Sequence, residues 1–322
     1  MLVLSRPFVG ATALAISLIG EATAQATYGF ATLPPGSLLH AQASVIAKAV
    51  EDTTKMQIRV IGFGGDAAMF DAVNTKKADF LILDVGETSD ALQGARTWKD
   101  NAKSNLRLAM TLYPFQMGPF VRKDSTIQSM ADLKGKRVPS GWVAQTGNLP
   151  HAQAMLGTGG LTYNDVTQVP AVNVIRAADD FKSGKLDVFF FAVGAPKVAE
   201  VAASVNGVRY VPLNVGPDSL AALKKVRTEY YFTKANPAPH VAGIDKPTDV
   251  LTIDLIIGVG AHVADDAVQE FVRAVHKSKA AMVEGHPAFR AYEPNEAGKL
   301  QPRLPHHPGA TKFFKEAGIA KG

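Results

Sequence analysis

Three polar turns stand where the chain passes from an expected strand to an expected helix, and their residues could hold a small molecule. The first is Pro34-Pro35-Gly36-Ser37, the second is Gly62-Phe-Gly64-Gly65-Asp66, and the third is the long segment 139–148 around Trp142. Pro and Gly interrupt regular structure, and a Ser or Asp that follows them can cap a helix. The free N–H groups and positive dipole end of such a helix suit a carboxylate or another polar group.

The second turn also fits an enzymatic site. The motif Gly62-x-Gly64-x-x-Ala67 follows a strand-like run, and Asp84 closes the next such run. This is the dinucleotide-binding fingerprint with its acidic partner for a ribose hydroxyl. Against this interpretation, the chain's first strand–turn–helix unit is the earlier one at Gly36, and the helix between Asp66 and Asn74 is short. An exported dinucleotide-dependent enzyme therefore stays open as an alternative.

Other catalytic and metal-binding patterns do not occur in the sequence. It has no cysteine, no Gly-x-Ser-x-Gly turn, and no His-x-x-x-His or His-Glu-x-x-His spacing among its eight histidines. Asp66 and Asp84 could form a carboxylate pair for acid–base catalysis, but a helix cap and a strand-end residue are the simpler interpretation. We expect a binding cleft with no catalytic residue, no metal and no cofactor.

The N-terminus has the pattern of an export signal. Arg6 precedes an apolar run over 8–19 that is too short to span a bilayer, and cleavage fits after Ala24 or Ala26. We expect a signal peptide over 1–24 and a periplasmic mature protein. The net charge is +5, but the basic residues are scattered, which argues against a nucleic-acid partner. Without cysteine the mature protein uses neither disulfides nor thiolate chemistry.

Strands and helices alternate along the mature chain, which is typical of open α/β sheets with helices on both faces. We expect a helix over 38–50 capped by Ser37, a helix from Asp66 to Val73 capped by Asp66, and a long helix from Asp265 to about Gly285. The expected strands include 56–61, 80–83, 106–112, 208–213 and 251–259.

The sequence also indicates two lobes. Residues 182–191 repeat the pattern of 74–83, a helix end followed by Lys, Asp and four apolar residues. We expect lobe one over 27–112 and 214–322, lobe two over 113–213, and crossings at 113–119 and 211–215. Ligands of open α/β sheets bind beyond the carboxyl ends of the strands, so the cleft is expected between the lobes.

Further motifs follow in a fixed order: Gly36-Ser37, Gly64-Gly65, Asp132-Leu-Lys-Gly-Lys-Arg137, Phe190-Phe-Ala-Val-Gly-Ala-Pro196 and His307-Pro-Gly-Ala-Thr-Lys-Phe-Phe-Lys-Glu316. In this order the chain resembles the exported solute-binding subunits of tripartite ATP-independent periplasmic (TRAP) transporters, of the TAXI subfamily. The resemblance implies a two-lobed type II periplasmic binding fold that closes on a small organic solute, often an amino acid or carboxylate. It also implies delivery to membrane-embedded TRAP subunits, and we expect a monomer.

The resemblance places the ligand-binding loops on particular residues of this sequence. The expected ligand-binding residues are Leu33, Gly36, Ser37, Gly65, Asp66, Asp84, Val85, Trp142, Gln145, Thr146, Ala192 and Gly194. In this hypothesis Ser37 and loop amides hold a polar or anionic group, and Trp142 covers the apolar part of the solute. Asp66 or Asp84 receives a donor or a cation. A periplasmic sensor for a signalling partner would use the same cleft and is a further alternative.

Two departures from the family pattern affect the expected ligand. The chain has Leu38-Leu39 where many members have a pair of tyrosines, and Val143-Ala-Gln-Thr146 where the usual loop is Gly-Ser-Gly-Thr. The solutes of better-known members are therefore a weak guide to the solute of this chain.

Overall fold

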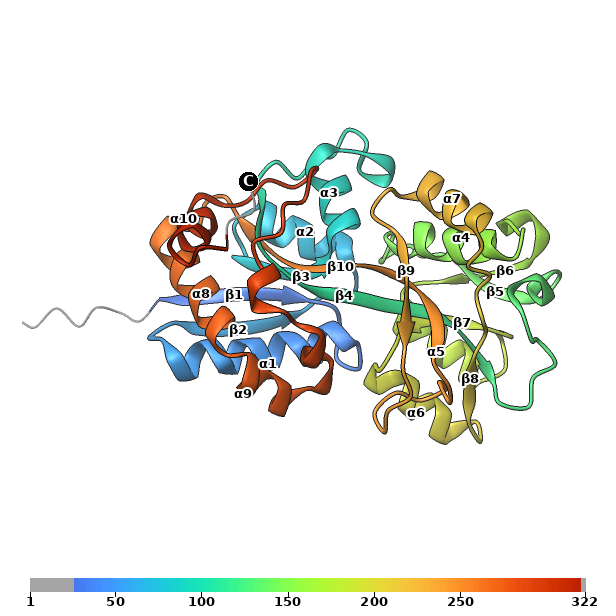
Figure 1. The fold of residues 1–322 in the computed structure, drawn as a ribbon. Coiled ribbons are helices and arrows are strands. Elements are labelled where there is room, and N and C mark those ends of the chain that lie inside the picture. The colour runs from blue at the N-terminus through green and yellow to red at the C-terminus, as the bar shows by residue number, and fades with distance from the viewer. Residues whose placement is uncertain (1–25, 320–322) are drawn as a thin grey trace, which may run out of the picture.

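The computed structural model describes residues 26–319, and its ribbon divides into two lobes that are joined by two long strands (Figure 1). The first lobe carries α1–α3 and α8–α10, and the second carries α4–α7. The expected signal peptide over 1–24 lies outside the described residues. Between residues 26 and 319, no helix combines the length and the apolar character needed to cross a membrane.

One mixed sheet runs through both lobes in the order β2-β1-β3-β10-β4-β7, with β8 paired to β4 and β9 paired to β10. β1 is parallel to β2 and β3, whereas β10 is antiparallel to β3 and β4. The strands are β1 (Thr27–Thr32), β2 (Gln57–Gly62), β3 (Phe80–Asp84), β4 (Leu106–Arg122), β7 (Phe189–Ala192), β8 (Val208–Tyr210), β9 (Tyr231–Ala235) and β10 (Thr248–Gly260). A second, parallel pair in the second lobe is β5 (Arg137–Gly141) and β6 (Thr167–Ala171).

Helices cover both faces of the sheet. They are α1 (Leu38–Thr53), α2 (Asp66–Asn74), α3 (Val85–Gln93), α4 (Asn148–Thr158), α5 (Val174–Lys182), α6 (Pro196–Ser204), α7 (Pro217–Val226), α8 (Asp265–Lys277), α9 (Lys279–Gly285) and α10 (Pro308–Glu316). Five short 3-10 turns, η1 (Arg96–Trp98), η2 (Met130–Leu133), η3 (Tyr163–Asp165), η4 (Pro287–Ala291) and η5 (Pro294–Glu296), complete the described elements. The expected long helix over 265–285 is wrong in one respect: it is two helices that meet at Ser278.

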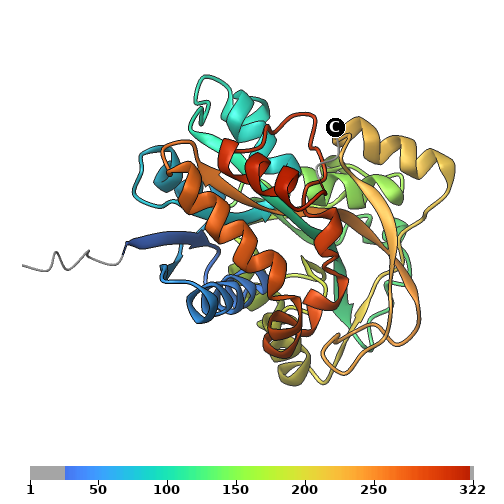
Figure 2. The ribbon, with the colours of Figure 1, turned by 60° about the vertical axis from the view of Figure 1, so that its left-hand side comes forward.

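The core of the first lobe is aromatic. Phe80 of β3 stacks on Phe271 of α8 with ring centroids 4.1 Å apart, and Phe30 of β1 meets both rings edge-on. β3 is buried along its whole length, as its continuous apolar run predicts. Figure 2 shows the orange α8 and the red α10 packed together on this lobe.

The connection between the lobes is partly as predicted. The expected strand over 106–112 and the expected crossing over 113–119 form one continuous strand, β4. The crossing expected at 211–215 does not lead the chain back to the first lobe, because β8 pairs with residues 120–122 at the far end of β4 and the following helix α7 packs on α4. β10 is the strand that runs back beside β4. The proposed lobe boundaries stay a prediction.

Candidate functional site

A cavity of about 60 Å³ lies between the lobes, where the carboxyl ends of β1, β3 and β7 meet the first turns of α1 to α5. Its polar wall is formed by Asp66, Asp84, Glu87, Gln145, Asn148 and His151. The remainder is mostly apolar: Leu33, Leu38, Leu39, Leu83, Phe115, Met117, Met155, Val174, Phe190, Phe191 and Ala192, with Gly147 between them. The meeting of strand ends and helix starts follows the general rule for ligand sites in open α/β sheets.

The first polar turn shapes the cavity but does not offer its hydroxyl to it. Ser37 caps α1 as predicted, because its Oγ accepts the His40 N–H at 3.1 Å. Gly36 makes the turn with φ +91°, and its carbonyl oxygen accepts the backbone N–H of Lys197 in the second lobe at 3.2 Å. The residues that reach the cavity from this turn are Leu33, Leu38 and Leu39. This part of the wall is therefore apolar.

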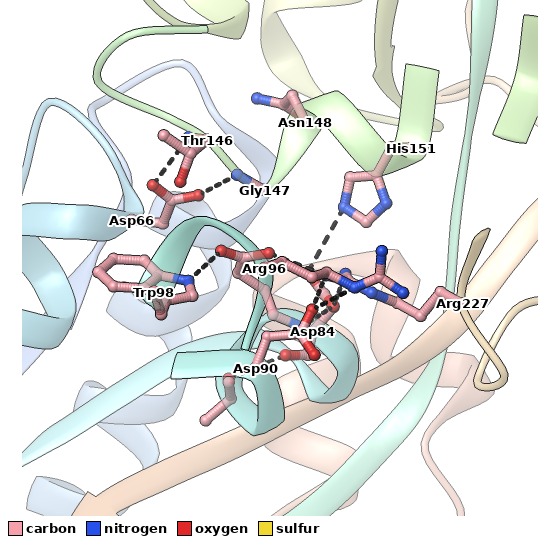
Figure 3. A network of polar contacts seen from close by, with 12 residues as sticks. Asp66, Asp84, Asp90, Arg96, Trp98, Thr146, Gly147, Asn148, His151 and Arg227 are labelled. Atoms are coloured by element: carbon pink, nitrogen blue, oxygen red, sulfur yellow. Dashed lines mark hydrogen bonds and ion pairs between the residues drawn. The ribbon is translucent and has the colours of Figure 1, made fainter. Parts of the chain in front are cut away.

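The second turn bridges the lobes through Asp66. The helix α2 is capped by Gly65, not by Asp66 as predicted, and Asp66 is its first residue. The buried Asp66 carboxylate accepts backbone N–H groups from Ala67 at 2.8 Å, Thr146 at 3.1 Å and Gly147 at 2.7 Å (Figure 3). The last two lie just before α4 in the second lobe, so a first-lobe carboxylate already occupies the amides at the start of α4.

The glycines beside Asp66 allow the lobes to approach this closely. A Cβ on Gly65 would lie 1.6 Å from the Ala144 carbonyl oxygen, whereas a Cβ on Gly64 would meet nothing within 4 Å. The Asn173 side-chain amide donates to the Gly64 carbonyl oxygen at 2.8 Å. The backbones of the two lobes are therefore in direct contact at Gly65.

The end of β3 leads into a buried charge cluster. Asp84 caps α3 by accepting the Glu87 N–H at 2.9 Å. The buried Arg227 guanidinium lies 3.4 Å from Asp84, 3.0 Å from Glu87 and 2.6 Å from Asp90, three carboxylates that face it from the start of α3 (Figure 3). Glu87 also accepts the Trp98 indole N–H at 2.8 Å. Arg227 thus provides a buried cation shared by three carboxylates of α3.

The three carboxyl groups of the cavity wall differ in pKa. Burial and repulsion from Glu87 raise the pKa of Asp66 to about 8, although its three amide donors act in the opposite direction. Burial also raises the pKa of Glu87, against the attraction of Arg227. Burial acts to raise the pKa of Asp84 too, but contact with His151 and the charge of Arg227 outweigh it and lower that pKa. Near neutral pH, Asp84 is thus charged and Asp66 binds a proton readily.

The structure brings some of the expected ligand-binding residues together and places others elsewhere. Those that line the cavity are Leu33, Asp66, Asp84, Gln145 and Ala192. Those that do not are Gly36, Ser37, Gly65, Val85, Trp142, Thr146 and Gly194. Gly194 borders a separate groove of about 350 Å³ beside the crossing strands. Thr146 takes part only through its backbone N–H.

Trp142 has a different role from the one expected of it. Its side chain is completely buried, and its indole nitrogen lies 3.1 Å from the Tyr163 hydroxyl in the second lobe. It does not line the cavity and so cannot cover the apolar part of a solute there. Phe115, Phe190 and Phe191 supply the aromatic surface instead.

Sequence reasoning missed Glu87, Asn148, His151 and Arg227. The acidic series on α3 has a local signal, because Asp84, Glu87 and Asp90 recur every three residues and so share one helix face. Arg227 has no such signal, because it lies 137 or more positions from its partners. Its place in the cluster depends on the tertiary fold alone.

The geometry does not favour the dinucleotide alternative. Gly65 packs against Ala144 and the Asp66 carboxylate fills the space before α4, so the turn faces the second lobe instead of a pyrophosphate. Asp84 is held by Glu87 and Arg227, not presented to a ribose. Across residues 26–319, no three His, Cys, Asp or Glu side chains form a group that could hold a metal ion.

Comparison with known proteins identifies the family. The sequence pattern of the NMT1-like family matches residues 30–318, and the chain belongs to that family. Its fold is similar to a solved structure described as a periplasmic transporter, with a TM-score of 0.58, 13% identity and coverage of 91% of this chain and 92% of that one.

Two further solved structures share the fold. The alkanesulfonate-binding protein SsuA from Xanthomonas axonopodis pv. citri, bound to MOPS, has a TM-score of 0.52 and 13% identity, with 92% and 94% of the two chains covered. The substrate-binding protein of an amino acid ABC transporter has a TM-score of 0.51 and 12% identity, with 82% and 99% covered. These similarities confirm the expected α/β fold with two lobes, open sheets and helices on both faces.

Proposed function

We propose that this protein captures a small organic solute in the periplasm by hinge closure and delivers it to a membrane transporter of the TRAP type. The observation that carries the proposal is the cavity itself, which is walled by both lobes and by the first turns of five helices. The TAXI motifs of the sequence support the choice of transporter class. The pattern of an export signal over 1–24 supports the periplasmic location.

Contacts between the lobes support hinge closure as the mode of capture. Gly36 accepts from Lys197, Gly64 accepts from Asn173, and Asp66 accepts from Thr146 and Gly147. All of these are hydrogen bonds to backbone groups, which water can replace when the lobes separate. An open and a closed form connected by β4 and β10 would then differ little in the hydrogen bonding of these groups.

The size and lining of the cavity limit the solute. At roughly 10–15 Å³ for each water-sized group, a cavity of about 60 Å³ holds about four to six such groups. A small carboxylate or amino acid, as the family resemblance implies, has this size. Phe115, Phe190 and Phe191 would contact its apolar part.

A binding role accounts for the polar wall better than catalysis does. Asp66 is held by backbone amides, Asp84 by Glu87 and Arg227, and His151 by Tyr230. None of these groups lies beside a serine or lysine poised as a nucleophile on the cavity wall. An enzyme would reveal itself by turnover of the bound compound.

Small-angle scattering tests the proposal. Protein purified from the periplasm is analysed by native mass spectrometry for a retained solute, then unfolded, freed of it and refolded. Addition of that solute should shrink the radius of gyration and raise Tm in proportion to the logarithm of its concentration. An unchanged radius with bound solute would exclude hinge closure. Copurification with permease subunits would favour transport, whereas copurification with a signalling protein would favour the sensor alternative.

A further inference from the structure

The anion-binding position at the start of α4 is already filled. Asp66 accepts from Thr146 at 3.1 Å and from Gly147 at 2.7 Å, and its side chain is 99% buried because only 1% of the residue is exposed. Gly147 has no room for a second anion, since even a Cβ on it would lie 2.8 Å from the Asp66 carboxylate and 2.9 Å from that of Glu87. The amides that would attract an anionic solute are therefore bound to the protein's own carboxylate.

Acidic side chains outnumber basic ones around the cavity. Asp66, Asp84 and Glu87 line it, whereas none of its lining residues in the described chain is Lys or Arg. Arg227 lies behind the wall and is shared among Asp84, Glu87 and Asp90. Arg96 and Arg303 pair with Asp90, which does not line the cavity. A carboxylate solute would meet three acidic groups and no facing cation.

One carboxylate oxygen on the wall lacks a close donor. Asp84 Oδ1 accepts from Glu87 and Arg227, but Asp84 Oδ2 has only His151 Nε2 at 3.5 Å, the outer limit of a hydrogen bond. Asp84 is 97% buried, with 3% of the residue exposed, and both it and His151 line the cavity. A buried carboxylate oxygen without a close donor is costly, so this oxygen would gain from a donor on the solute.

His151 is held by Tyr230 and reaches Asp84 Oδ2 only at the outer limit of hydrogen bonding, 3.5 Å. Its Nδ1 lies 2.6 Å from the Tyr230 hydroxyl. Burial raises the pKa of Tyr230, so its hydroxyl stays protonated and can either donate to Nδ1 or accept from it. The Asp84 charge favours the tautomer with the proton on Nε2, where it faces Oδ2 at 3.5 Å, and a donor on the solute can approach that oxygen more closely.

We infer that the solute presents a cationic or hydrogen-bond-donating head to Asp84, and that the Asp66 carboxyl group occupies the amides at the start of α4, so that the solute does not bind there. The inference rests on the proposed function and names its solute class. The apolar side of the cavity, with Leu38, Leu39 and Phe190, then receives a short hydrocarbon portion. A small organic ammonium compound, or an amino acid bound through its ammonium group, meets these requirements.

Three probes that share one hydrocarbon chain test the charge preference. Refolded, solute-free protein is titrated with n-butylammonium, n-butanol and n-butyrate, and Kd is measured by calorimetry. We expect n-butylammonium to bind at least about tenfold more tightly than n-butanol, and n-butyrate to show no binding. Asp84→Asn should remove the tenfold preference, and the matched control Asp52→Asn, on the exposed end of α1, should retain it. Equal binding of the cation and the alcohol, or tighter binding of n-butyrate, would overturn the inference.

Chemical rescue tests the role of Asp66 separately. Asp66→Ala frees the Thr146 and Gly147 amides, so acetate should raise the Tm of this variant in a concentration-dependent manner and leave the wild-type Tm unchanged. Asp66→Asn, which keeps an oxygen at the same place, is the control and should not respond to acetate. A wild-type protein that responds to acetate as strongly as Asp66→Ala does would contradict an occupied anion position.

The two proposals fail in different ways. If n-butyrate binds and compacts the protein in small-angle scattering, the solute class is wrong and hinge capture stands. If n-butylammonium binds with the expected preference but the radius of gyration does not change, the solute class stands and hinge capture is wrong.

Discussion

Two buried carboxylate sites lie next to one another at the cavity, and their carboxyl groups are held by different kinds of donor. In the Asp66 clamp, which comprises Asp66 and the amides of Ala67, Thr146 and Gly147, uncharged N–H groups hold one carboxylate between the lobes. In the Arg227 cluster, which comprises Arg227 with Asp84, Glu87 and Asp90, a permanent cation holds three carboxylates. Both sites are closed to solvent, but only the Arg227 cluster carries its own counter-charge.

The difference separates a structural site from a responsive one. A guanidinium remains charged at every physiological pH, so the Arg227 cluster keeps its cation throughout that range. The Asp66 clamp has only neutral donors, and its carboxyl group gains or loses a proton close to neutral pH, because burial and Glu87 raise the pKa of Asp66 to about 8. We therefore expect stability to depend on Arg227, and closure to depend on Asp66 and the residues around it.

Loss of the cation should have the largest effect. Arg227→Met leaves Asp84, Glu87 and Asp90 buried without it, and we expect the free energy of unfolding to fall by about 3–5 kcal/mol. Urea unfolding followed by circular dichroism measures the change. Arg96→Met is the matched control, because the Arg96 side chain is 42% exposed, pairs with Asp90 and donates to the Val226 carbonyl oxygen, and its loss should cost less than about 1 kcal/mol. Similar small losses from both variants would show that the cluster is not a structural unit.

A side chain at Gly65 should break the Asp66 clamp without changing any charge. Gly65→Ala places a Cβ 1.6 Å from the Ala144 carbonyl oxygen, so the closed arrangement is no longer accessible. We expect solute affinity to fall by about 100-fold, which is about 2.7 kcal/mol, with little loss of stability in the open form. Calorimetry gives the affinity, and small-angle scattering gives the radius with saturating solute.

Gly64→Ala is the natural control for that experiment. A Cβ at Gly64 meets nothing within 4 Å, and Gly64 lies in the same turn, directly before Gly65. Its affinity should stay within about twofold of wild type, which is well under 1 kcal/mol. Equal losses of solute affinity in Gly64→Ala and Gly65→Ala would indicate that backbone flexibility of the turn matters, and not contact between the lobes.

The charge of Asp66 should be visible as a pH dependence. The folded protein binds a proton at Asp66 up to about pH 8, whereas the unfolded chain releases it near the ordinary value of 3.8. Folding therefore takes up a proton in this window, and stability falls as pH rises through it. Between pH 6 and 8, Asp66→Asn should reduce this slope by as much as about 1 kcal/mol per pH unit. Glu87 is the charged group that acts on Asp66, Asp84 and His151 line the same cavity, and Arg227 pairs with Glu87.

Urea midpoints at pH 6, 7 and 8 measure this slope. Glu87→Gln serves as the second variant, because repulsion from Glu87 contributes to the raised pKa of Asp66. It should flatten the wild-type slope in part, whereas Asp66→Asn should flatten it further. A wild-type stability that increases from pH 6 to pH 8 would contradict the sign.

The sequence predicts well those features of this protein that depend on residues close together in the chain. The Ser37 cap of α1 joins residues three positions apart and forms as predicted. The buried strand β3 and the extended passage through Pro114 follow from local composition and are also present. Each of these features needs only a few consecutive residues to be specified.

What the sequence could not supply depends on groups far apart in the chain. Asp66 was expected to cap its own helix, but its partners are amides 80 and 81 residues away. Arg227 meets α3 only because α7 packs on α4 and brings the following residues across. At the break between α8 and α9, the Ser278 hydroxyl donates to the Ala274 carbonyl oxygen. Ser makes this contact in many unbroken helices, so the residue type alone does not predict the break.

Substitution of Trp142 should have the smallest effect on the protein. It tests whether the loop that carries the clamp donors affects solute binding independently of the surface that would contact the solute. Trp142→Phe removes the indole N–H at 3.1 Å from the Tyr163 hydroxyl but keeps a buried ring, so we expect a loss of about 1 kcal/mol in stability. Solute affinity should be unchanged, whereas Phe190→Ala, which shortens a side chain on the cavity wall, should weaken it. Urea unfolding gives the stability of each variant, and calorimetry gives its affinity for the solute. Trp142→Phe could instead weaken solute binding as much as Phe190→Ala does. The packing of Trp142 in the second lobe would then affect the position of the loop before α4, and the geometry of the Asp66 clamp would depend on residues outside the clamp.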